Sequence, residues 1–119
     1  MLLLIMEIKI IKNPITKMEL KQLLIEGFDL VKAVVDIEKE IIAVGGELHM
    51  DGLELLMREE SSEPKNIWGI NLYSMIEGDG FIEFDSMVNL KPAFGNRTRG
   101  VDNLEIQKKI IGIVSNLIK

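Results

Sequence analysis

Two short runs rich in β-branched residues lie close together in the first half of the chain, and they constrain the fold more than any other feature. Residues 30–36 read LVKAVVD and residues 40–44 read EIIAV. The residues at the junction of the two runs, 36–39 (DIEK), are mostly polar. Such runs on either side of a short polar stretch predict two strands joined as a hairpin. Because a hairpin makes its strands antiparallel, the pattern favours an antiparallel sheet over repeated strand–helix–strand units.

A second hairpin is predicted further along the chain. Residues 66–73 (NIWGINLY) and 81–90 (FIEFDSMVNL) flank a loop that ends in Gly-Asp-Gly. Alternation in the second run separates an apolar set from a polar set: Ile82, Phe84, Val88 and Leu90, against Glu83, Asp85, Asn89 and Lys91. We expect the apolar set to face the core and the polar set to face water, with Asn71 opposite the polar row.

A strand and two helices are predicted around these hairpins. Residues 6–12 (MEIKIIK) indicate a first strand that stops at an Asn-Pro turn. Thr16 and Glu19 form a capping pattern ahead of an apolar helical stripe that ends near Gly27. Asp102 is the predicted cap of a last helix, with Glu105 at the fourth place. The inner stripe of that helix is Ile106, Ile110, Ile113 or Val114, and Leu117.

The order of these segments predicts an α+β fold in a single domain, residues 1–119. We expect an antiparallel sheet of about five strands built from hairpins, with two main helices packed on one face. Residues 51–58 fit a short helix or the end of another strand, and residues 59–65 predict an exposed loop. Residues 1–5 precede the first predicted element, so we expect them to be a dispensable extension.

Composition excludes several classes of function. The chain of 119 residues has no Cys and one His, which excludes thiol nucleophiles and cysteine-ligated zinc. Walker, Rossmann and Gly-x-Ser-x-Gly motifs are missing from the sequence. The apolar opening is too short for a signal peptide, and no stretch reaches the roughly 20 apolar residues of a membrane span. We therefore expect a soluble cytoplasmic protein with no cofactor and no membrane partner.

Charge is distributed unevenly along the chain. The formal net charge is −5, yet residues 36–63 are strongly acidic and residues 91–119 are basic. Overall acidity argues against general nucleic-acid binding, which depends on neutralising phosphates. The two regions could instead face each other, within the fold or across a homodimer.

The most unusual distribution is that of arginine. Two of the three Arg residues, Arg97 and Arg99, lie in the loop GNRTRG just before the predicted last helix. Guanidinium groups bind phosphate and carboxylate with two parallel hydrogen bonds, and a helix start adds free N–H donors. Asn96 tolerates left-handed backbone and offers a further hydrogen bond. The alternative is structural: Asp102 occupies those donors, and the Arg pair bridges to the acidic middle of the chain.

Acidic residues suggest two weaker sites. If the segment around His49 is extended, Glu47, His49 and Asp51 project to one side, as a metal site or an oriented general base would require. An acidic, solvated strand edge explains the same pattern, and with a single His we expect no metal there. Glu83 and Asp85 could likewise hold Mg²⁺, although a solvent-facing sheet surface is the simpler interpretation. Trp68 is expected to pack in the core or at the sheet edge.

Several segments resemble a known family. KAVVDIEKEIIAVGGELHMD, WGINLY, IEFDSMVNLKP and GNRTRGV are similar to segments of short, uncharacterised bacterial and archaeal proteins classed as a domain of unknown function. The resemblance covers Met6 to the C-terminus and implies that members begin near Met6. It implies no activity, substrate or catalytic residue.

The sequence thus favours a binding module for a small anionic ligand, or for a partner that carries phosphate or carboxylate. Its site would lie where the arginine loop meets the polar strand face, and its ligand-binding residues would be Asn96, Arg97, Arg99, Glu83, Asp85, Asn89 and His49. One alternative is a Mg²⁺-assisted phosphoester hydrolase with Glu83 and Asp85 as ligands and His49 as base. The other is a structural homo-oligomer without catalytic activity.

Overall fold

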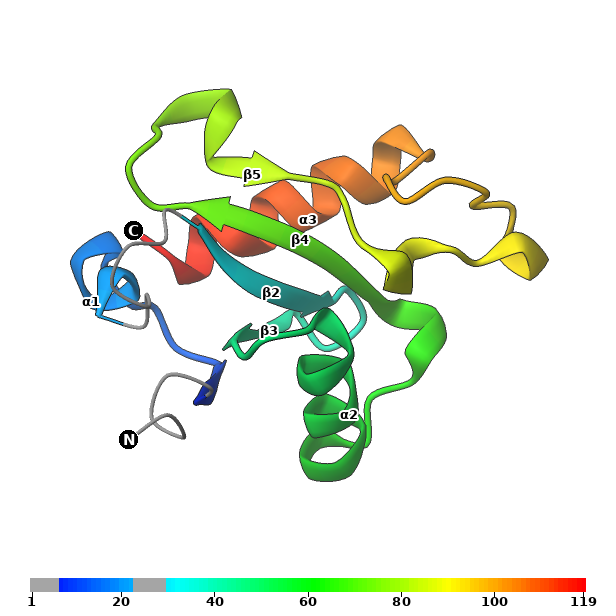
Figure 1. Ribbon diagram of the computed structural model, residues 1–119, viewed down its shortest axis with the longest axis horizontal. Coiled ribbons are helices and arrows are strands. Elements are labelled where there is room, and N and C mark those ends of the chain that lie inside the picture. Colours follow the sequence, from blue (N-terminus) through cyan, green and yellow to red (C-terminus); the bar gives the residue numbers. More distant parts are fainter. Residues whose placement is uncertain (1–6, 23–29) are drawn as a thin grey trace.

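A five-stranded antiparallel sheet forms the centre of the protein (Figure 1). The computed structural model describes residues 7–22 and 30–119. The strand order is β1-β3-β2-β4-β5. The strands are β1 (Ile8–Ile11), β2 (Leu30–Asp36), β3 (Ile41–Gly45), β4 (Ile67–Tyr73) and β5 (Ile82–Glu83). Both predicted hairpins are present, because β2 pairs with β3 and β4 pairs with β5. The predicted α+β class is therefore confirmed.

Within residues 7–22 and 30–119, three helices and four single 3₁₀ turns accompany the sheet. The helices are α1 (Lys17–Lys21), α2 (His49–Glu60) and α3 (Leu104–Leu117). The 3₁₀ turns are Pro64–Asn66, Gly78–Phe81, Met87–Asn89 and Pro92–Phe94. Thr16 caps α1 through the predicted reciprocal hydrogen bonds with Glu19. The predicted end of this first helix near Gly27 lies outside the described residues, as do residues 1–6.

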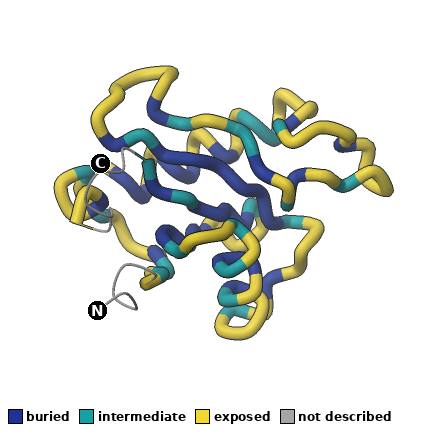
Figure 2. Tube along the Cα trace, in the orientation of Figure 1, coloured by how far each residue is buried: buried dark blue, intermediate teal, exposed yellow. Residues whose placement is uncertain are grey.

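The sheet is covered on both faces, because alternate residues of its strands enter two separate cores. On one face, Leu20 of α1 and the inner stripe of α3 pack over the larger core, which includes Trp68 and Ile70. On the other face, α2 packs over a smaller core that includes Val34 and Ile67. The two predicted helices thus share a face. The segment that the sequence left undecided, residues 51–58, is helical and covers the opposite one (Figure 1). Figure 2 shows the resulting band of buried residues along the central strands.

The region after β5 departs from the predicted alternation. The strand ends at Glu83, and a 3₁₀ turn at Met87–Asn89 reorients the side chains that follow. Val88 therefore packs against the smaller core, whereas Phe84 packs against the larger one. Leu90 is exposed and Asn89 is fully buried. The predictions that Val88 and Leu90 share the core face with Phe84, and that Asn89 faces water, are wrong.

Helix boundaries bear on three further predictions. Residues 49–51 begin α2, so the condition of an extended segment around His49, on which the site of Glu47, His49 and Asp51 depended, is not met. The same helix continues to Glu60, and Ser62 is buried, so only part of residues 59–65 is an exposed loop. Asn103, not Asp102, caps α3, because the Asn103 side chain accepts hydrogen bonds from two backbone N–H groups of the first turn.

The two ends of the described chain are joined. The backbone N–H of Ile15 donates to the carbonyl of Leu117 at 2.8 Å, and the N–H of Lys119 donates to the carbonyl of Ile15 at 2.8 Å. Ile118 is buried in the larger core beside them. Neither stretch of the described chain, 7–22 or 30–119, contains a helix long and apolar enough to cross a bilayer.

Candidate functional site

Asn96 organises the loop between the 3₁₀ turn Pro92–Phe94 and α3. Its side-chain NH₂ donates to the carbonyls of Asn89 at 2.7 Å and Gly100 at 2.8 Å. Its side-chain oxygen accepts from the backbone N–H of Asp102 at 2.8 Å. With only 4% of its surface exposed, Asn96 holds the loop together.

Asp102 occupies donors that an anion would need. Its carboxylate accepts from the Thr98 hydroxyl at 2.5 Å and from the backbone N–H of Arg97 at 3.0 Å. These hydrogen bonds, that of Thr98 foremost, lower the pKa of Asp102. Asp102 thus fills donors of the loop, whereas Asn103 fills the N–H donors at the start of α3 that the structural alternative gave to Asp102.

The two arginines of the loop have different surroundings. Arg99 donates from Nε to Asp85 Oδ1 at 2.6 Å, in an ion pair that is about half exposed. Arg97 is exposed and makes no ion pair within the described parts of the chain. None of the four ion pairs formed by residues 7–22 and 30–119 joins the acidic stretch 36–63 to the basic stretch 91–119. The partner of Arg99 lies instead just after β5.

A polar row crosses the sheet on the face that carries α2. Asn71 lies opposite Glu83, as the simple hairpin register predicts. Its side-chain NH₂ donates to Glu83 Oε1 at 2.9 Å, and the hydroxyl of Tyr73 donates to the same oxygen at 3.0 Å. The hydrogen bond to Glu83 raises the pKa of Tyr73. Glu83 is therefore held in place by two neutral donors from β4.

His49 lies beside this row, at the first turn of α2. Its Nε2 is 2.8 Å from the carbonyl of Ile70. Because a carbonyl only accepts, Nε2 carries the proton and Nδ1 is the basic nitrogen. Burial lowers the pKa of His49, and the positive charge of Lys32 on β2 acts in the same direction. The Ile70 carbonyl, Asn71 and Asp85 act in the opposite direction.

The structure therefore brings together four of the seven predicted ligand-binding residues: His49, Glu83, Asp85 and Arg99. Asn89 and Asn96 are internal, and Arg97 is apart from the row. Sequence reasoning missed Tyr73 and Lys32 in this cluster. Tyr73 follows Asn71 by two residues, so strand alternation was a usable signal for it.

The one-sided arrangement of Glu47, His49 and Asp51 that a metal would require is not formed. The helical start of α2 separates Glu47, His49 and Asp51, and Asp51 instead accepts from the backbone N–H of Leu48 at 3.2 Å. Within residues 7–22 and 30–119, no group of three or more His, Cys, Asp or Glu side chains could hold a metal ion.

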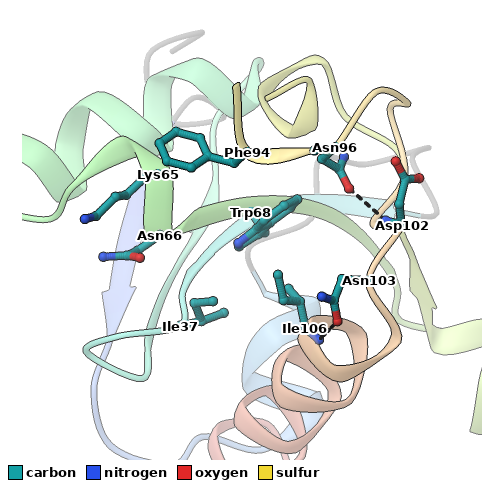
Figure 3. A pocket seen from close by; sticks show the side chains of 10 residues that line it. Ile37, Lys65, Asn66, Trp68, Phe94, Asn96, Asp102, Asn103 and Ile106 are labelled. Atoms are coloured by element: carbon teal, nitrogen blue, oxygen red, sulfur yellow. Dashed lines mark hydrogen bonds between the residues drawn. The ribbon is translucent and has the colours of Figure 1, made fainter. Parts of the chain in front are cut away.

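A cavity of about 620 Å³ lies beside the Asn96 loop, on the face that carries α3 (Figure 3). Its apolar wall comes from four separate segments: Ile37, Trp68, Phe94 and Ile106. Its polar lining includes Lys65, Asn66, Asn96, Asp102 and Asn103. Volumes of this size are typical of small-molecule sites.

Trp68 gives this cavity its chemical character. Only 4% of its surface is exposed, and its Nε1 has no hydrogen-bond partner within the described residues. Figure 3 shows the indole nitrogen turned toward the side of the cavity where Asn66 and Ile37 lie. Lys91 supports the ring, because its Nζ lies 5.0 Å from the ring centroid and donates to the carbonyls of Pro64 and Val88. Trp68 packs in the core as predicted, but its unpartnered donor was not foreseen.

Comparisons with known proteins identify a family but no individual curated protein or solved structure. No curated protein and no solved structure matches the chain. Residues 9–117 match the family model described as "Protein of unknown function (DUF5674)". Because this match covers nearly the whole chain, the protein belongs to the DUF5674 family.

Proposed function

We propose that the protein is a binding module for a small ligand that carries a carboxylate or phosphate, and that the ligand occupies the Trp68 cavity. The observation that carries the proposal is the buried, unpartnered Nε1–H of Trp68, a residue that lines a cavity of about 620 Å³. A buried donor without an acceptor costs roughly 1–3 kcal/mol. A ligand oxygen placed against Nε1 would recover that free energy.

Charge and shape favour an anionic ligand with an apolar body. Lys65 lines the cavity, and its ion pair with Glu63 at 3.4 Å is exposed and therefore easily exchanged. Asp102 also lines the cavity, but its carboxylate already accepts from Thr98 and Arg97. Phe94 and Ile106 provide apolar contact area for the rest of the ligand.

The proposal differs from the sequence-based site in its location. The sequence placed the anion at Arg97 and Arg99, whereas the ion pair between Arg99 and Asp85 disfavours that position. The alternatives receive less support. Glu83 Oε1 already accepts two hydrogen bonds, which weakens the hydrolase hypothesis. Ile110 and Ile113 of α3 are buried in the core of the same chain, which weakens the homo-oligomer hypothesis.

Trp68 is the only tryptophan, so its fluorescence reports on this cavity alone. Titration with phosphates, nucleotides and aromatic carboxylates should change that fluorescence for at least one class. Trp68→Phe removes the donor but keeps most of the packing, and calorimetry should show binding weakened by about 10-fold to 100-fold. The double variant Arg97→Ala, Arg99→Ala serves as the control and should bind as the wild type does. Loss of binding in this control with full binding by Trp68→Phe would contradict the proposal and restore the arginine site.

A further inference from the structure

A second cavity adjoins the Trp68 cavity. Its volume is about 410 Å³, and it shares Lys65 and Asn66 with the first. Its lining is mostly polar and charged, with Asp36, Glu38 and Glu63 contributing three acids against Lys39 and Lys65. A ligand that occupies the first cavity can therefore extend past Lys65 and Asn66 into a more acidic compartment.

Asp36 gives this second cavity a specific polar group. Its Oδ1 accepts from the backbone N–H groups of Glu38 at 2.9 Å and Lys39 at 3.0 Å, in the turn between β2 and β3. Its Oδ2 is buried and has no partner within residues 7–22 and 30–119, and only 1% of the residue is exposed. A buried carboxylate oxygen without a donor is costly, so it favours a bound group that donates.

The position of Asp36 is rigid. It is the last residue of β2 and pairs with Ile41 of β3 and Ile67 of β4. Strand pairing on both sides thus holds the backbone of Asp36 beside the cavity that it lines.

We infer that this second cavity binds an ammonium or similar cationic donor, and that the ligand carries this group in addition to its anionic end. The inference rests on the proposed function, because it names the chemical class of the same ligand: a zwitterion with an apolar middle. The anionic end faces Trp68 Nε1 and Lys65, and the cationic end faces Asp36 Oδ2. The N–H donor of Trp68 thereby meets an acceptor of the ligand in the first cavity, and the Asp36 acceptor meets a donor of the ligand in the second.

Two matched probes test this arrangement. The first is 4-(aminomethyl)benzoate, which carries a carboxylate, a ring and an ammonium group. The second is 4-ethylbenzoate, in which a methyl group replaces the ammonium. Calorimetry on the full chain should show the ammonium probe binding at least about tenfold more tightly, as expected for a charge-assisted hydrogen bond.

Variants test whether Asp36 Oδ2 causes the preference for the ammonium probe. Asp36→Asn keeps an acceptor for the turn but replaces Oδ2 with a donor, so the tenfold preference should disappear while 4-ethylbenzoate binds as before. Glu54→Gln removes the same unit of charge from an exposed side chain that lines neither cavity, and it should keep the preference. Trp68→Phe should weaken both probes equally.

Failure of the inference is distinct from failure of the proposed function. Equal binding of the two probes to the wild type, or an unchanged preference in a folded Asp36→Asn protein, would overturn the inference and leave the anion cavity standing. If neither probe binds, the inference fails. If the phosphates, nucleotides and aromatic carboxylates also leave the Trp68 fluorescence and the thermal midpoint unchanged at millimolar concentration, the proposed anion cavity fails with it.

Discussion

At the scale of single residues, two asparagine side chains hold the region in which the sheet ends. Asn89 Oδ1 accepts from the backbone N–H of Gly69 at 2.7 Å, and its NH₂ donates to the carbonyl of Gly69 at 3.0 Å. One amide thus pairs with both backbone groups of a β4 residue, as a neighbouring strand would. A glycine at position 69 also leaves room for the segment that carries Asn89, because a Cβ there would collide with the side chain of Ser86. Asn96 then ties the same segment to the loop before α3.

His49 makes stability depend on pH. Burial of the imidazole is the largest influence on His49, and it lowers the pKa of this residue in the folded state below the ordinary value of 6.5. At a pH between the lowered pKa of the folded state and the unfolded-state pKa of about 6.5, His49 binds more protons in the unfolded chain than in the folded one. The free energy of unfolding therefore falls as the pH drops below about 6.5. We expect the loss to stop once the pH is below the folded-state pKa.

Urea titrations between pH 5 and 7.5, followed by Trp68 fluorescence, measure this dependence. His49→Gln is the matched control, since Gln can donate to the Ile70 carbonyl without titrating. The difference in unfolding free energy, wild type minus variant, should decrease from pH 7.5 to pH 5. A difference that stays constant or increases on acidification would show that His49 is not held neutral.

At the scale of elements, the start of α3 shows how one residue decides a boundary. Asn103 Oδ1 accepts from the N–H groups of Glu105 at 2.8 Å and Ile106 at 3.2 Å. Asn103→Ala should therefore destabilise the fold by about 1 kcal/mol. Asn103→Ser, which retains a capping oxygen, should recover most of that loss in the same denaturant titration. If Ala and Ser proved equally stable, the cap would contribute nothing.

The spacing of apolar residues correctly predicted those strands and helices that have one clearly apolar and one clearly polar face. The alternating strand that starts the second run, the capped first helix and the inner stripe of α3 follow from residues that repeat at two or near 3.6, whereas the first hairpin follows from its β-branched runs. It failed at residues 47–51, where five alternating residues are too few to separate a strand from the first turn of a helix. It failed again after Glu83, because a single 3₁₀ turn at Met87–Asn89 shifts the register of every residue that follows.

The candidate site was only partly predictable for a related reason. Strand alternation and hairpin register placed Glu83, Asp85 and Asn71 together, because these rules act between neighbouring residues and strands. The Trp68 cavity depends on segments far apart in sequence, and no local pattern indicates that they meet. An unpartnered buried N–H, such as that of Trp68, is visible only once every neighbour has been placed.

At the scale of the whole molecule, the chain is closed by contacts between its first and last described segments. Ile15 and Ile118 form a parallel bridge, and Ile11, Leu20 and Ile118 share the larger core. Stability of the whole domain should thus depend on a few residues at one end.

Removal of residues 118 and 119 should destabilise the protein by about 3 kcal/mol. The deletion takes away the buried side chain of Ile118 and the backbone hydrogen bond from Lys119 to Ile15. For a domain of this size we expect the thermal midpoint to fall by roughly 10 °C. Lys119→Ala, which keeps the backbone bond, should change the midpoint by less than about 2 °C. A deletion that behaves like this control would show that the bridge is dispensable.

The position of α3 also determines when the fold can be completed during synthesis. The smaller core, under α2, is built from residues that precede Leu90, so it can assemble before the residues of α3 have left the exit tunnel. The larger core requires α3, and until then one face of the sheet, with Trp68, Ile70 and Leu72, is uncovered. We therefore expect the nascent chain to present this apolar face to ribosome-associated chaperones until residue 118 has emerged from the exit tunnel.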